Sequence, residues 1–137
     1  MSALEPRRGK PSSPIPVLVL DDDANECAVT LALLAAAGCA ALAESDGDAA
    51  VRHARTSLTR LLVSELYIPC AEGMCIVAVL KGDRARLPRL QILVHTRHTD
   101  DEDTEWALAA GCDTIVYKSA AFGVLVREVR RLQSVAR

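Results

Sequence analysis

The sequence lacks an excess of basic residues and any long apolar run. Among its 137 residues, 16 are Lys or Arg and 18 are Asp or Glu, which gives a net charge of -2. Nucleic-acid-binding proteins usually carry a basic face, so the composition argues against a nucleic-acid partner. No apolar run approaches the ~18 residues that a membrane-spanning helix requires. We therefore expect neither nucleic acid nor membrane as a partner.

The cysteines lack the spacing of a zinc site or of a secreted disulfide framework. Their number is odd, none forms a CxxC pair, and no apolar signal segment precedes them. We therefore expect a reducing, cytoplasmic location, in which each cysteine acts as a small buried hydrophobic residue. The five are Cys27, Cys39, Cys70, Cys75 and Cys112.

The chain is long enough for one hydrophobic core, and half of its residues are hydrophobic (50%). Residues 1–16 mix prolines with Arg7, Arg8 and Lys10 and have no hydrophobic periodicity, which predicts a flexible tail. Residues 17–135 are expected to form a single folded domain.

Five short apolar runs alternate with five helical patterns in this domain. The predicted strands are 17–20, 39–43, 61–64, 90–96 and 114–117, and the predicted helices are 24–37, 46–57, 74–81, 100–110 and 122–132. This alternation is typical of a parallel sheet with right-handed crossovers and helices on both faces. The sequence predicts an α/β fold with a doubly wound, five-stranded parallel sheet and five helices.

Polar residues follow the predicted strands at their carboxyl ends, where parallel α/β sheets place their chemistry. They are Asp21, Asp22, Glu65, Thr96 and Lys118. Three neighbouring carboxylates repel one another and require a cation or a protonated member. Lys118 can supply one positive charge, and a magnesium ion could supply more. A hydroxyl and an ammonium beside an acidic cluster are suited to binding a phosphoryl group.

Four ordered motifs carry a resemblance to a known family: VLVLDDD, LLVSELYIPCAEGM, ILVHT and GCDTIVYK. With these motifs the chain resembles the receiver domain of bacterial two-component response regulators, a flavodoxin-like phosphorelay module. The resemblance implies that Asp21 and Asp22 match the acidic pair that binds magnesium. It also implies that Thr96 and Lys118 match the two groups that contact the phosphoryl group, and that Glu65 stands where the phosphoacceptor aspartate is expected.

The chain departs from the family pattern around this site. Glu65 replaces the aspartate, Ile115 stands at the switch-aromatic position, and Ser119 replaces the proline that follows the lysine. Arg97 replaces a small residue, so it is a candidate gate that covers the pocket or pairs with a carboxylate. We therefore expect an atypical receiver, or pseudo-receiver, that acts through phosphorylation-independent protein–protein interaction. No cofactor is expected, and magnesium binding at Asp21 and Asp22 should be weak or lost.

Two interpretations of Glu65 stay open: it imitates the phosphorylated state, or it marks a degenerate pocket. An alternative function is a haloacid-dehalogenase-like phosphohydrolase with Asp21 as nucleophile and Asp23 as second acid. That family needs an acidic motif after the lysine, and only Glu128 follows Lys118. The sequence therefore favours a protein that is not an enzyme, and a pure docking module is the third reading.

The expected partner is a histidine kinase or a downstream signalling protein. A further hypothesis is a homodimer through the fourth predicted helix, the fifth strand and the fifth helix. Residues 100–103 (DDED) would there face Arg127, Arg130 and Arg131 of the second copy. His95 and His98 are interpreted as solvated histidines.

Overall fold

The five strands form one parallel sheet in the order β2-β1-β3-β4-β5. The computed structural model describes residues 17–56, 59–70, 75–82, 87 and 89–136. The strands are β1 (Val17–Leu20), β2 (Ala41–Glu44), β3 (Leu61–Ser64), β4 (Gln91–Thr96) and β5 (Thr114–Tyr117). The helices are α1 (Ala24–Ala36), α2 (Gly47–Thr56), α3 (Ile76–Gly82), α4 (Asp101–Ala110) and α5 (Phe122–Ala136). The predicted fold class is confirmed.

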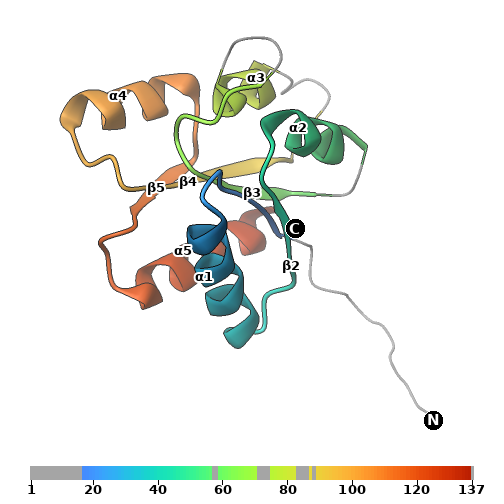
Figure 1. Cartoon of the computed structure of the whole chain (residues 1–137), viewed down its shortest axis with the longest axis vertical. Helices are drawn as coiled ribbons and strands as arrows, with labels where there is room; N and C mark the ends of the chain where they lie inside the picture. Colours follow the sequence, from blue (N-terminus) through green and yellow to red (C-terminus); the bar gives the residue numbers. More distant parts are fainter. Residues whose placement is uncertain (1–16, 57–58, 71–74, 83–86, 88, 137) are drawn as a thin grey trace.

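Helices cover both faces of the sheet, with α2, α3 and α4 on one side and α1 and α5 on the other (Figure 1). Two hydrophobic cores result, one on each face. Strands β1 and β3 lie inside the sheet and are buried at every residue. This burial explains why both strands read as unbroken apolar runs rather than as alternating patterns.

Local signals set the ends of α1. Asp23 is the N-cap, and its carboxylate accepts hydrogen bonds from the backbone N–H groups of Asn25 and Glu26. After the helix, Gly38 adopts a φ of 81°, a conformation that costs glycine little. The backbone N–H of Cys39 then donates to the carbonyl of Leu34 and closes the helix end.

Because of this hydrogen bond, the second strand begins later in the chain than we predicted. We predicted it at 39–43, which is wrong, because Cys39 still belongs to the helix terminus and β2 begins at Ala41. The fourth strand, predicted at 90–96, is confirmed to within one residue, since β4 runs from Gln91 to Thr96. Thr96 is therefore the last residue of a strand, where its side chain has a fixed direction.

The structure also tests the prediction that the cysteines are buried. Four of the five cysteines are buried and Cys75 is half-buried. The predicted tail at 1–16 lies outside the described residues. The same holds for residue 57, where the second predicted helix ends, and residue 74, where the third one begins. None of the helices among the described residues is long and apolar enough to cross a membrane.

Candidate functional site

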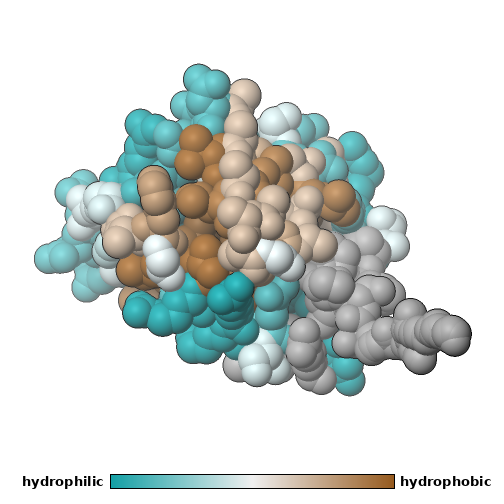
Figure 2. Space-filling model, turned by 90° about the horizontal axis from the view of Figure 1, so that it is seen from below, coloured by the Kyte–Doolittle hydropathy of each residue, from teal (hydrophilic) through white to brown (hydrophobic). Residues whose placement is uncertain are grey.

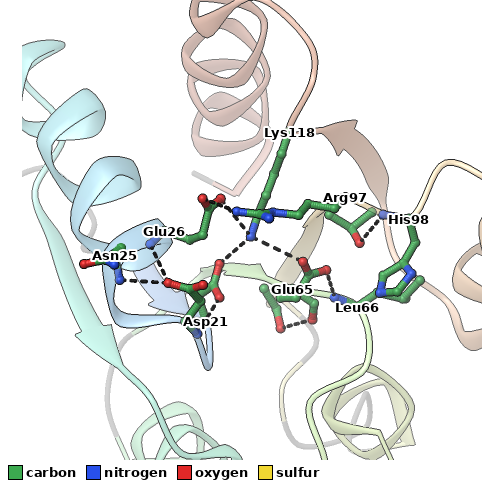
Figure 3. Close-up of polar contacts among 11 residues, drawn as sticks. Asp21, Asn25, Glu26, Glu65, Leu66, Arg97, His98 and Lys118 are labelled. Carbon is green, nitrogen blue, oxygen red and sulfur yellow. Dashed lines mark hydrogen bonds and ion pairs between the residues drawn. The ribbon is translucent and has the colours of Figure 1, made fainter.

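The polar residues predicted from the sequence lie at the carboxyl edge of the sheet (Figure 3). Asp21 follows β1, Glu65 follows β3, Thr96 ends β4 and Lys118 follows β5. The parallel register pairs Leu20 with Ser64 and Thr96 with Tyr117, and β4 continues two residues beyond Val94, the partner of Ser64. The topology therefore gathers side chains that lie up to 97 positions apart in the sequence.

Lys118 is the centre of the cluster. Its Nζ lies 2.7 Å from Asp21 Oδ2, 3.3 Å from Glu65 Oε1 and 3.4 Å from Glu26 Oε1. Only 9% of the Lys118 side chain is exposed, and the figures for Asp21 and Glu65 are 5% and 14%. Burial would lower the pKa of Lys118, but the hydrogen bond with Asp21 and the charge of Glu65 outweigh it and raise the pKa.

Glu65 is held by three different donors. Its Oε2 accepts a 2.6 Å hydrogen bond from the backbone N–H of Leu66, and Oε1 faces Lys118. The carboxylate also accepts a hydrogen bond from the Thr96 hydroxyl. Burial acts to raise the pKa of Glu65, and these hydrogen bonds and Lys118 together lower it below its usual value of 4.5. Glu65 is therefore ionised and charge-paired at neutral pH.

Thr96 links the cluster to the loop after β4. Its hydroxyl oxygen accepts a 3.1 Å hydrogen bond from the backbone N–H of His98. The same hydroxyl has one hydrogen to donate, and it donates this hydrogen to Glu65. Thr96 is almost fully buried (1% exposed) and so lacks water as a competing partner.

Glu26, which the sequence reasoning missed, joins the cluster from the first turn of α1. Its carboxylate pairs with the Arg97 guanidinium as well as with Lys118. The hydrogen bond from Arg97 holds the pKa of Glu26 below its usual value. The signal that could have revealed Glu26 is its position one helical turn after Asp22. Arg97 itself is 63% exposed, so it lies at the mouth of the site and not inside it.

Other predicted site residues lie outside this cluster. Asp22 is exposed, because successive residues leaving a strand point in opposite directions and Asp21 takes the inward one. Ile115 is half-buried and packs against the core under α2, α3 and α4. The peptide between Lys118 and Ser119 is trans. These positions leave the roles that we predicted for Asp22 and Ile115 as predictions.

The interpretation of His95 as a solvated histidine is wrong. The ring is half-buried and lines a small cavity with Val29, Val116 and Phe122. Burial lowers the pKa of His95 to about 4, and the neighbouring Lys118 charge acts in the same direction. His95 is therefore neutral at physiological pH.

The arrangement does not fit a magnesium site. Among the described residues, no group of three His, Cys, Asp or Glu side chains is placed to hold a metal ion. Asp21 contacts the Lys118 ammonium through Oδ2 and accepts the Asp23 N–H through Oδ1 at 2.9 Å. Both oxygens are therefore already engaged by donors. Weak or absent magnesium binding stays a prediction, and these contacts are its physical reason.

The carboxylates of the phosphohydrolase alternative have other structural roles. Asp23 is exposed and caps α1, and Asp21 is buried against Lys118. Glu128 lies in α5 and pairs with Arg131. Because Asp23 caps the helix, it does not stand beside Asp21 as the second acid of the Asp-x-Asp arrangement that we considered.

Solved structures with a similar fold include two receiver domains and a chemotaxis protein. The receiver domain of the Francisella response regulator 1452 is 19% identical, with a TM-score of 0.77 over 89% of this chain and 98% of that one. The receiver domain of a histidine kinase from Syntrophus aciditrophicus is 24% identical, with a TM-score of 0.76 over 88% and 90%. The chemotaxis protein CheY4 of Vibrio cholerae is 21% identical, with a TM-score of 0.75 over 88% and 99%.

At these identities the structural likeness shows the fold alone. None of the curated proteins compared is similar enough to this chain to count as a match. The family is shown by sequence, since the model of the response regulator receiver domain matches residues 17–130. This match covers all five strands and the first four helices, together with most of α5. The chain therefore belongs to the response regulator receiver domain family.

Proposed function

We propose that this receiver domain is a pseudo-receiver, which signals by phosphorylation-independent contacts with a protein partner. Receiver domains are in general signalling modules that interact with histidine kinases or other signalling proteins. The proposed partner of this domain is of that class, and the proposed setting is the cytoplasm of a bacterial cell. The phosphohydrolase alternative receives no support from the family match.

One observation carries the proposal: the Glu65 carboxylate binds both the Thr96 hydroxyl and the Lys118 ammonium. These are the two groups that a phosphoryl group at this edge would use for its oxygens. Glutamate is one methylene, about 1.5 Å, longer than aspartate. The extra length supports a reading in which the carboxylate occupies the place of a phosphoryl group.

The contacts around Glu65 support a site that does not change between an unphosphorylated and a phosphorylated state. Lys118 connects Glu65 to Asp21, and Glu26 connects Lys118 to Arg97. A phosphoryl donor would have to approach in line with a Glu65 oxygen, and displacements of about 1 Å can cost ~100-fold in such reactions. Oε2 accepts the hydrogen bond from the backbone N–H of Leu66, so this oxygen is already engaged. The carboxylate is thus placed as a permanent anion.

The test is exposure of the protein to acetyl phosphate and magnesium, followed by intact-mass spectrometry. We expect no adduct on the unmodified protein and a partial adduct on Glu65→Asp, which restores the shorter acceptor beside Thr96 and Lys118. The matched control is Glu44→Asp, which removes one methylene from a glutamate at the end of the neighbouring strand β2. A labile adduct that maps to Glu65 in the unmodified protein would contradict the proposal.

A further inference from the structure

After its first turn, the outward face of α1 is apolar from Ala28 to Ala36. From Cys27 to Ala37 the helix has no charged residue. Its exposed positions recur at helical spacing and form one surface, which we call the α1 face: Ala28, Val29, Ala32, Ala35 and Ala36. Figure 2 looks onto the side of the molecule that α1 and α5 cover, and apolar residues gather at its centre inside a hydrophilic rim.

Larger apolar side chains extend the α1 face toward α5. Val29 is 50% exposed, and Phe122 at the start of α5 is 65% exposed. Both line the small cavity that contains His95. A surface helix normally turns a charged or polar stripe to solvent, and helices that are apolar all round are normally buried. Contiguous apolar patches on a soluble domain mark interaction surfaces.

Charges occur only at the two ends of this surface, and they have opposite signs. Asp22 and Asp23 precede the helix and are exposed. At the other end Arg130 of α5 donates a 2.7 Å hydrogen bond to the carbonyl of Ala37, which brings a guanidinium to the C-terminus of α1. The α1 face is thus acidic at one end, apolar in the middle and basic at the other end.

We propose that the α1 face binds a second copy of this chain by antiparallel packing of the two α1 helices. A two-fold axis through the middle of the helix would place the apolar stretches together. It would also place Asp22 and Asp23 of each copy opposite Arg130 of the other, so that the same charge pairing occurs at both ends of the contact. The alanines allow the helix backbones to approach closely, and Val29 and Phe122 supply larger apolar surface at the edge of the contact.

The structure favours this surface over the α4–β5–α5 homodimer that the sequence suggested. In that contact Arg127 and Arg131 would have to reach the acidic start of α4. In the structure both lie within ion-pair distance of Glu128 on their own helix. On α4, Asp103 accepts a hydrogen bond from Tyr67. Three of the charges that this contact would use, Arg127, Arg131 and Asp103, therefore already have partners within the same molecule.

The test compares two exposed alanines, one on each candidate surface. Ala32→Glu places a charge at the centre of the α1 face, and Ala109→Glu is the matched change on α4. We expect sedimentation velocity to show a concentration-dependent dimer for the unmodified chain, weakened at least ~10-fold by Ala32→Glu and unchanged by Ala109→Glu. Circular dichroism should show the same helix content in all three proteins.

The salt dependence of the dimer and the reciprocal exchange of its charged residues provide two independent measurements. Because the centre of the contact is apolar, the dimer should persist in 1 M NaCl, where the Debye length is only ~3 Å. At low salt, Asp22→Arg and Arg130→Glu should each weaken the dimer, and the two changes together should restore it. A chain that stays monomeric at millimolar concentration would overturn the proposal, and so would a dimer that Ala109→Glu alone disrupts. Dimerisation only after removal of residues 1–16 would also overturn it, because the occupant of the α1 face would then be that segment.

Discussion

Replacement of Lys118 by methionine removes the cation that the carboxylates of the site share. Methionine keeps most of the length and apolar volume of lysine, so the change removes charge more than packing. Lys118 is the nearest cation to Asp21 and Glu65, whose side chains are 5% and 14% exposed. Without Lys118, two nearly buried carboxylates would face each other with no positive charge between them.

Loss of one partner from a buried ion pair typically costs ~3–5 kcal/mol of folding stability. The total stability of a domain of this size is about 5–15 kcal/mol, so the loss is a large fraction of it. With a urea m-value of ~2 kcal/mol per molar, the unfolding midpoint should fall by about 2 M. Urea titration followed by the circular dichroism of the helices measures this shift. The control, Arg131→Met, removes an exposed pair with Glu128 and should cost less than ~1 kcal/mol.

The pH dependence provides a second measurement on the same variants. The folded pKa of Glu65 lies below its usual 4.5, so its contribution to stability is present above pH 4.5 and is lost as the pH falls through the folded pKa. The pKa of Lys118 is raised, so its contribution is present below pH 10.5 and is lost at higher pH. In Lys118→Met the carboxylates can be neutralised by protonation instead. The stability difference between the two proteins should therefore shrink as the pH falls from 7 toward 4. A midpoint shift below about 0.5 M at pH 7 would refute the argument, because it would mean that water already solvates these carboxylates.

Two further outcomes follow from the contacts of the site and of the loop beside it. Isothermal titration with magnesium should give a dissociation constant above about 1 mM, because Lys118 occupies Asp21 Oδ2, and a value below 1 mM would contradict this. Gly47→Ala should destabilise the domain by ~1–3 kcal/mol in thermal unfolding, since a Cβ at Gly47 would lie 2.2 Å from the Pro69 carbonyl oxygen. The control Gly123→Ala, which adds a Cβ to open space in α5, should be neutral or slightly stabilising, and equal effects of the two changes would argue against the close approach.

Features that depend on neighbouring residues were predictable from the sequence. The unbroken apolar runs of β1 and β3 and the alternation of strands with helices were sufficient for the fold, since burial on both faces leaves a clear pattern. The residues at the strand ends were also predictable in outline, because all parallel strands finish at one edge. Asp23 as the helix cap is a local effect of the same kind.

Features that depend on side-chain direction were not predictable in this way. Asp21 and Asp22 are adjacent in the sequence, yet one is buried against Lys118 and the other is exposed. Glu26 reads as an ordinary first-turn acid of a helix, and its role in the cluster depends on how α1 packs against the end of β5.

The sequence by itself determined the order of the elements, the parallel sheet and the set of residues at its carboxyl edge, because hydrophobic patterns and caps act over a few neighbouring positions. The tertiary structure decided which of those residues form ion pairs. The pairing of Glu65 with Lys118, and of Glu26 with Arg97, depends on how closely β3, β5, α1 and the loop after β4 approach one another. It also decided that α1 turns an uncharged surface outward, since the same alanine-rich sequence would serve equally well inside a core.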